Sequence, residues 1–184
     1  MIRTLVFGIL VLAAVALAVA FVAMLKLYRI PSASMEPTLR CARPAPGCTA
    51  DTSDRVAAIR VEWPFESVDR GDIVAFRTPE LARQRCGAGG TFVARIVALP
   101  GETWAQRSGL VFVDGRRLEE PYVEDRRRDR ETYRPRRVPL GHYFVQGDNR
   151  GQSCDSRIWG PLPERNLVAK AVLTYWPPGR IAVR

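Results

Sequence analysis

The sequence predicts a mainly β protein of short antiparallel strands, preceded by an N-terminal transmembrane helix. Three features predict it: one long apolar segment at the start, several short runs rich in Val, Ile and Phe between turn residues, and no useful stretch of helical period after residue 40. The 184 residues suffice for one domain of ordinary size besides a membrane segment. We expect a membrane anchor in residues 1–27 and a single β-rich domain in residues 28–184.

The apolar segment extends from residue 4 to residue 25 without a charged residue or a proline. A helix of this length crosses about 30 Å of hydrocarbon. A cleavable secretory signal is the alternative, because the Ala-Val-Ala at residues 18–20 resembles a cleavage motif, but the apolar region of such a signal normally has about 7–15 residues. The sequence favours an uncleaved, single-pass anchor, with Trp63 and Phe65 as candidates for side chains that enter the bilayer beside it.

The segment after the anchor, residues 30–39, is expected to be an extended or turning loop because Pro31 and Pro37 discourage a helix there. Beyond it, five apolar runs are expected to form strands: residues 56–59, 73–76, 92–99, 110–113 and 168–176. Asp114 and Gly115 stand between residues 110–113 and 116–118, and this pair is typical of a tight hairpin.

The formal net charge is +9, and nearly all of it is arginine because Lys26 and Lys170 are the only lysines. Arginines gather between residues 126 and 137 with acidic side chains among them, a pattern typical of a solvated loop or ribbon. Because we expect a membrane anchor, we favour membrane lipids over nucleic acid as the partner of this positive charge.

Four cysteines are present: Cys41, Cys48, Cys86 and Cys154. Zinc sites prefer close cysteine pairs with histidine support, whereas this chain has no Cys-x-x-Cys and a single histidine, His142. Disulfides on an oxidising, extracytoplasmic side are favoured instead. Cys41 with Cys48 would close a short proline-rich loop, which leaves Cys86 to pair with Cys154.

A serine becomes a nucleophile only when another group removes its proton. His142 is the usual type of base, but it stands alone beside an apolar strand, where a histidine is more often a surface or packing residue. The sequence therefore points away from a histidine-dependent serine site.

Four sequence blocks occur in order along the chain. They comprise residues 31–39 directly after the anchor; residues 53–56 and 70–76; residues 92–102, followed by 111–115 and 120–122; and residues 147–157, followed by 159–160 and 166–171. Together they resemble bacterial signal peptidase I, the leader peptidase family of Ser/Lys-dyad serine proteases. The resemblance covers nearly the whole chain, and four blocks in register are much more specific than any one of them.

The resemblance implies that Ser34 is the nucleophile. Ser32 matches the hydroxyl that helps the backbone N–H of the nucleophile stabilise the developing oxyanion, and Ser153 matches the serine that orients the amine of the lysine base. A charged group is implied to brace the site, made by Asp155, Arg157 and Arg95. Taken alone, Ser32, Ser153 and Asp155 would be read as capping and turn residues.

Ala94 departs from the family pattern, because family members have lysine at this place. Their lysine works because burial lowers its pKa until the neutral amine accepts the serine proton. A methyl group accepts no proton, and the neighbouring Arg95 stays protonated. Neither Lys26 nor Lys170 matches the position of the family's general base. The chain is expected to be inactive or strongly impaired. Either a natural member lost its base or the lysine was replaced deliberately; the otherwise complete set of site residues favours replacement.

The resemblance also implies the substrate, which is the signal peptide of a secreted preprotein with small residues at the first and third positions before the cut. Such a peptide would lie extended against a strand edge, and no metal or cofactor is needed. The location implied is the cytoplasmic membrane of a bacterium, with the catalytic domain outside. A non-enzymatic protein that binds signal peptides is the alternative, and nucleic-acid binding is not expected. The candidate substrate-binding side chains are Tyr28, Ile30, Pro31, Met35, Leu39 and Val93.

Overall fold

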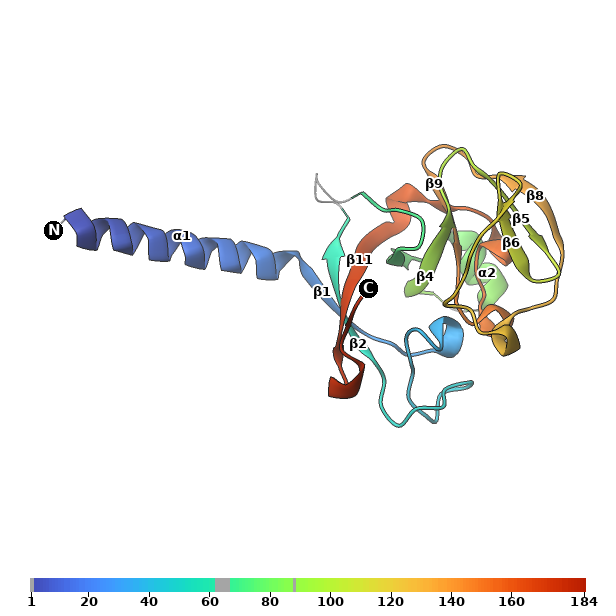
Figure 1. The fold of residues 1–184 in the computed structure, drawn as a ribbon, viewed down its shortest axis with the longest axis horizontal. Helices are drawn as coiled ribbons and strands as arrows, with labels where there is room; N and C mark the ends of the chain where they lie inside the picture. Colours follow the sequence, from blue (N-terminus) through green and yellow to red (C-terminus); the bar gives the residue numbers. More distant parts are fainter. Residues whose placement is uncertain (1, 62–66, 88) are drawn as a thin grey trace.

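The computed structural model describes residues 2–61, 67–87 and 89–184 (Figure 1). Trp63 and Phe65, the two predicted membrane-contact residues, lie outside this part of the chain. The helices are α1 (Ile2–Met24), α2 (Glu80–Cys86) and α3 (Ser156–Trp159). The strands are β1 (Leu25–Arg29), β2 (Arg55–Arg60), β3 (Ile73–Arg77), β4 (Thr91–Ala98), β5 (Thr103–Arg107), β6 (Leu110–Val113), β7 (Arg116–Arg117), β8 (Tyr133–Arg137), β9 (His142–Gln146), β10 (Leu162–Pro163), β11 (Leu167–Trp176) and β12 (Ala182–Val183).

Helix α1 extends away from the β-rich part of the molecule and leads into β1 (Figure 1). Counting only described positions, no helix reaches the length and apolarity that a membrane crossing requires. The single-pass anchor therefore remains a prediction, as does the division of the chain at residue 27.

The strands form two antiparallel sheets, so the mainly β prediction is confirmed (Figure 1). The larger sheet has the order β1-β2-β11-β3-β4-β9-β10, and β12 pairs with β11. The smaller sheet has the order β7-β6-β5-β8. Strand β4 lies deep within the larger sheet, where it pairs with β3 on one side and with β9 on the other.

All five predicted strands are present, as β2, β3, β4, β6 and β11. The predicted hairpin joins β6 to β7, and Asp114 and Gly115 have positive φ angles of 49° and 78°, as this kind of turn requires. The short helix α2 was not predicted, because its seven residues are too few to show a helical period. Strand β8 (Tyr-Arg-Pro-Arg-Arg) also lacks an apolar pattern; pairing with β5 defines it.

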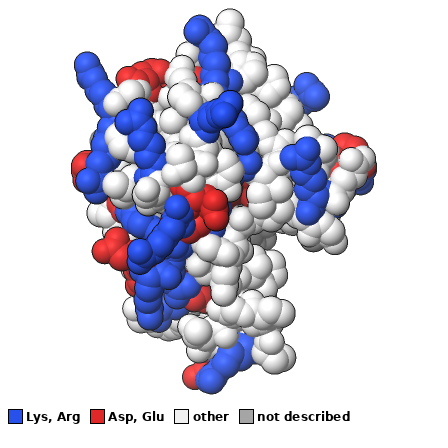
Figure 2. All heavy atoms as spheres, turned by 90° about the vertical axis from the view of Figure 1, so that its right-hand side faces the viewer, with Lys and Arg blue, Asp and Glu red and all other residues white. Residues whose placement is uncertain are grey.

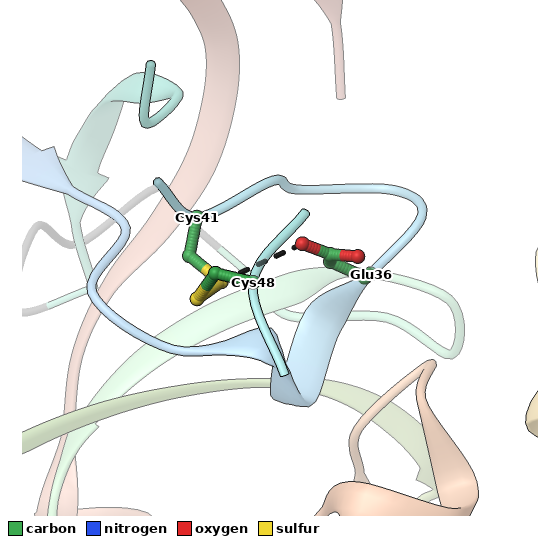
Figure 3. Close-up of side chains that lie close together, drawn as sticks. All are labelled: Glu36, Cys41 and Cys48. Atoms are coloured by element: carbon green, nitrogen blue, oxygen red, sulfur yellow. Dashed lines mark hydrogen bonds between the residues drawn. A yellow bond between two sulfur atoms is a disulfide. The ribbon is translucent and has the colours of Figure 1, made fainter. Parts of the chain in front are cut away.

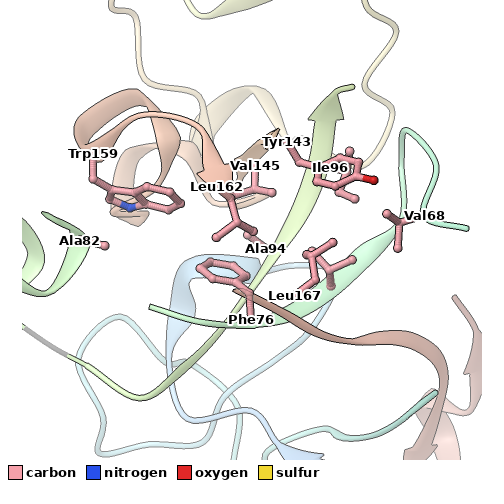
Figure 4. Close-up of a cluster of buried hydrophobic side chains, with 11 residues drawn as sticks. Val68, Phe76, Ala82, Ala94, Ile96, Tyr143, Val145, Trp159, Leu162 and Leu167 are labelled. Carbon is pink, nitrogen blue, oxygen red and sulfur yellow. The ribbon is translucent and has the colours of Figure 1, made fainter. Parts of the chain in front are cut away.

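The main core cluster lies on one face of β3 and β4 and includes Phe76, Ala94, Val145, Trp159 and Leu162 (Figure 4). A second cluster lies around residues 30–48, beside β2, β3 and β11. A third joins the two sheets, where the Trp104 and Phe144 rings stack with centroids 4.1 Å apart. The candidate site residues in segment 30–35 and in β4 are therefore held in place by buried hydrophobic side chains.

Both predicted disulfides are present. Cys41 pairs with Cys48, with Cα atoms 5.2 Å apart, and Cys86 pairs with Cys154, with Cα atoms 5.9 Å apart. The second bridge joins the end of α2 to the segment before α3, which lie 68 residues apart in sequence.

The arginine-rich segment is only partly a solvated ribbon. Arginine side chains spread over the end of the molecule remote from α1, with acidic side chains among them (Figure 2). However, the side chains of Arg127 and Arg128 are only 15% and 14% exposed, because they pair with the buried Glu36 and Glu120. These two arginines hold the segment against the domain.

Candidate active site

Ser34 lies in a single 3₁₀ turn, Ala33–Met35, directly after the chain leaves β1. The two neighbours of Ser34 are buried in the second core cluster, with exposed fractions of 4% for Ala33 and 1% for Met35. Burial of both neighbours fixes the serine between them. The Ser32 and Ser34 hydroxyl oxygens lie 3.2 Å apart, within hydrogen-bond distance.

Asn149 holds the turn that carries Ser34. Its backbone N–H donates to the carbonyl oxygen of Ser34 at 3.0 Å, and its side-chain amide donates to the carbonyl oxygen of Ala33 at 2.9 Å. Asn149 is buried, so water competes little for these bonds. The segment after β9 therefore determines where Ser34 stands.

Gly147 allows the closest approach in this region. A Cβ atom at this position would overlap the Ser153 hydroxyl and the Ser34 carbonyl oxygen. Strands β4 and β9 pair Arg95 with Gln146, so the next pair in the same antiparallel register is Ala94 with Gly147. The absence of a side chain at Gly147 thus lets Ser34 and Ser153 pack beside the strand that carries Ala94.

Asp155 and Arg157 form a buried ion pair under the site. The carboxylate of Asp155 accepts hydrogen bonds from Arg157 Nε at 2.8 Å and Nη2 at 2.7 Å, and also from the Gly147 N–H at 3.1 Å. Burial alone would lower the pKa of Arg157, but the negative charges of Asp155 and Asp129 outweigh it and raise the pKa. Arg157 therefore stays charged, and Asp155 links it to the backbone of Gly147.

One cavity of about 610 Å³ joins these parts. Its polar wall includes the side chains of Ser32, Ser34 and Ser153, and Ala94 lies on its apolar wall. The complete lining in the described part of the chain is Ile30, Pro31, Ser32, Ala33, Ser34, Met35, Pro46, Gly47, Phe76, Cys86, Gly89, Thr91, Phe92, Val93, Ala94, Gln152, Ser153, Cys154 and Asp155.

A cavity that presents a fixed serine over an apolar wall fits a serine hydrolase, and comparison with known proteins gives the family. The family model "Signal peptidase, peptidase S26" matches residues 2–176. The chain belongs to this signal peptidase family.

Two curated relatives illustrate the match. The signal peptidase I of Leptolyngbya laminosa is 35% identical over 153 residues, which cover 83% of this chain and 69% of the relative. The probable signal peptidase I-1 of Synechocystis sp. (strain ATCC 27184 / PCC 6803 / Kazusa) is 37% identical over 152 residues, covering 82% and 71%. A crystal structure of a signal peptidase I from Enterococcus faecalis V583 is 29% identical, with a TM-score of 0.46, and covers 55% of this chain and 94% of that one.

Most of the residues predicted from the signal peptidase resemblance come together. Ser32, Ser34, Ala94, Ser153 and Asp155 line the same cavity. Arg157 lies behind them, against Asp155. The three segments that supply these residues are more than 50 residues apart along the chain, so their meeting was not a local consequence of sequence.

Arg95 does not join the Asp155–Arg157 pair. Arg95 follows Ala94 on β4 and is not among the residues that line the cavity. It forms two hydrogen bonds to Asp148, at 2.9 and 2.6 Å, and its guanidinium lies 3.9 Å from the centre of the Tyr122 ring. Arg95 supports the other face of the sheet.

The predicted substrate-binding side chains divide into two groups. Ile30, Pro31, Met35 and Val93 line the cavity. Tyr28 and Leu39 do not: Leu39 is fully buried in the second core cluster, and Tyr28 packs on the alanine cluster of β2, β3 and β11.

The other candidate proton acceptors lie away from Ser34. The Lys170 ammonium is 3.0 Å from the Asp72 carboxylate, an ion pair outside the cavity lining. His142 stands at the start of β9, with Nδ1 3.0 Å from the carbonyl oxygen of Leu140. Lys26, on β1, is also outside the lining.

Several cavity residues were not predicted. Phe92 precedes Ala94 by two positions on β4, so the alternation of a strand could have placed both on one face. Gly47 lies opposite Gln152, and Cys86 and Cys154 bring their disulfide to the wall. No local sequence signal distinguishes Gly47 from any loop glycine.

Glu36, Cys41 and Cys48 form the one grouping of potential metal-ligand atoms found within the described residues (Figure 3). The two sulfurs are joined to each other, so neither is a thiolate that could bind a metal. The Glu36 carboxylate is buried and accepts a 3.0 Å hydrogen bond from Arg127. This grouping is therefore a structural support of the loop after Ser34, and the residues present do not fit a metal.

Proposed function

We propose that the chain is built to remove signal peptides from secreted preproteins as a membrane-bound serine endopeptidase, and that Ala94 leaves it inactive or strongly impaired. The observation that carries this proposal is the shared cavity of Ser34, Ala94 and Ser153. It supports both halves of the proposal, because the predicted nucleophile lines the cavity and the side chain at position 94 is a methyl group, which accepts no proton.

The chemistry follows from the positions of three serines. Ser34 would attack the carbonyl carbon of the scissile peptide and form an acyl-enzyme. The Ser34 backbone N–H and the Ser32 hydroxyl would bind the developing oxyanion, which is consistent with the 3.2 Å separation of the two hydroxyls. Ser153 would orient an amine projecting from position 94. Without that amine, Asp155 is the one ionisable side chain among the described lining residues, and Arg157 and the Gly147 N–H already bind its carboxylate, so it is not free to take the Ser34 proton.

The substrate would lie extended across Ile30, Pro31, Met35 and Val93, which supply an apolar wall on the Ser34 side of the cavity. A wall of this kind favours small apolar side chains near the cleavage point, as the family resemblance implies.

Attachment to the bacterial cytoplasmic membrane, with the domain on its outer side and against the lipid, is part of the proposal. The apolar sequence from residue 4 to residue 25 supports the anchor. The two disulfides support an oxidising compartment for the domain.

A second function is favoured by one observation. The cavity is intact although Ala94 lacks a base, so the chain could bind signal peptides without cutting them. The same experiment distinguishes these two functions.

The test compares the full chain in detergent with three variants on a preprotein substrate. Ala94→Lys should cleave at least about 100-fold faster than the original chain, since a positioned general base contributes roughly 10²–10⁴-fold. Ala94→Arg, which adds charge but no proton acceptor, should stay inactive, as should Ala94→Lys combined with Ser34→Ala. No cleavage by Ala94→Lys, together with tight signal-peptide binding, would overturn the enzyme function in favour of the binding protein.

A further inference from the structure

The cavity beside Ser34 extends into the hydrophobic core at Ala94. Phe76 is only 1% exposed and Ala94 only 4%, yet both line the cavity. Val74 pairs with Ala94 across the sheet, and both belong to the main core cluster, so the side chain at position 94 points into apolar surroundings (Figure 4). A long side chain at position 94 would occupy space that the alanine methyl group leaves open.

The polar end of this space has an unused hydroxyl. The carbonyl oxygen of Ser153 accepts a hydrogen bond from Arg157 at 3.3 Å. The Ser153 hydroxyl has no hydrogen-bond partner among the described residues. The hydroxyl packs over Gly147, where it meets the turn of Ser34. A serine hydroxyl can donate one hydrogen bond and accept others, so it suits an uncharged amine nitrogen.

We propose that the space at Ala94 is a binding site for a short, neutral primary alkylamine, and that the bound amine restores proton transfer at Ser34. This inference rests on the proposed function. The alkyl chain would lie against Phe76 and Phe92, and the nitrogen would reach Ser153 and Ser34. The missing part of a lysine beyond its Cβ is three carbons and one nitrogen, so propylamine fits best.

The neutral form is selected because the site offers no free negative charge. Of the lining residues that the structure describes, Asp155 is the one that carries a charge, and Arg157 and the Gly147 N–H already bind its carboxylate. Transfer of an ammonium ion into such an apolar space is unfavourable. Binding should therefore increase as pH approaches the amine's own pKa, which is near 10.4 for the comparable lysine amine.

The reaction balances without further reagents except water. The amine lone pair takes the proton of the Ser34 hydroxyl, the oxygen bonds to the scissile carbonyl carbon, and the ammonium then protonates the leaving amine as the peptide C–N bond breaks. In the second half, the amine takes a proton from water, the hydroxide oxygen bonds to the ester carbon, and the ammonium returns the proton to the Ser34 oxygen as the ester bond breaks. The amine is regenerated.

The test uses the full chain in detergent with methylamine, propylamine and hexylamine at constant ionic strength and pH 9. Propylamine should increase preprotein cleavage at least about tenfold in a saturable manner, as part of the roughly 10²–10⁴-fold contribution of a general base. Methylamine and hexylamine should be weaker. Binding is followed separately by ligand-observed NMR, which needs no activity.

Two variants serve as controls. Ala94→Met fills the space without supplying a base and should abolish both binding and activation, whereas Ser34→Ala should keep binding and lose activation. Failure of propylamine to bind, or equal activation of Ala94→Met, would overturn the site. If propylamine binds without activation while Ala94→Lys cleaves the preprotein, proton transfer by the amine is overturned but the proposed function stands. If Ala94→Lys is itself inactive, the proposed function is overturned.

Discussion

Replacing Asp155 by asparagine removes one charge from a buried ion pair while keeping the volume of the side chain. The Asp155 and Arg157 side chains are only 2% and 3% exposed. Four donors point at the carboxylate: the Arg157 backbone N–H, two guanidinium nitrogens, and the Gly147 N–H. An asparagine keeps one acceptor oxygen and places an NH₂ group against donors, so at least one buried donor loses its partner.

Removal of one partner of a buried ion pair typically costs about 3–5 kcal/mol. The lower end applies here, because Arg157 keeps its second carboxylate, Asp129. With a slope of about 2 kcal/mol per molar urea, a loss of about 3 kcal/mol lowers the unfolding midpoint by about 1.5 M. The midpoint is measured by tryptophan fluorescence on the full chain in detergent.

Asp125→Asn is the matched control, because the Asp125 side chain is fully exposed although it also pairs with an arginine, Arg128. It should leave the midpoint unchanged within error. The double variant Asp155→Asn/Arg157→Met should be less destabilised than the sum of the two single variants, because the interaction between the two side chains is then lost only once. An Asp155→Asn midpoint equal to that of Asp125→Asn would refute the role of the buried pair.

Two further predictions concern the turn that carries Ser34 and the opposite face of the sheet. In the Ala94→Lys variant, Asn149→Ala should lower kcat about tenfold with little change in KM, because the Ala33 carbonyl loses its amide donor. Cleavage kinetics on a preprotein measure this, and an unchanged kcat would contradict it. Burial and the nearby Glu120 raise the pKa of Tyr122 to about 12. The contribution of the neutral Tyr122 phenol to the free energy of unfolding is complete below about pH 10. It falls by up to roughly 2 kcal/mol as the pH rises towards 12, because the unfolded chain ionises first. Urea midpoints should therefore fall more steeply over this range than those of Tyr122→Phe, and parallel curves would contradict the assignment.

Local patterns predicted the parts of the fold that depend on neighbouring residues. The hairpin at Asp114 and Gly115 was predictable because a two-residue turn needs positive φ angles that these residues accept. The apolar runs of β2, β3, β4, β6 and β11 were predictable because a strand in the core selects Val, Ile and Phe. Strand β8 has no such run and could not be predicted, because its pairing with β5 and not its own residue pattern makes it a strand.

The sequence by itself determined the residue types of the candidate site, the family that they resemble, and the presence of a methyl side chain at position 94, because each can be read from residue identity and order. Only the tertiary structure decided how they meet. The register of β4 with β9 brings Gly147 beside Ala94, and the glycine lets Ser34 and Ser153 approach. It also decided that Arg95 binds Asp148, because the fold brings together two residues that lie 53 positions apart in the sequence.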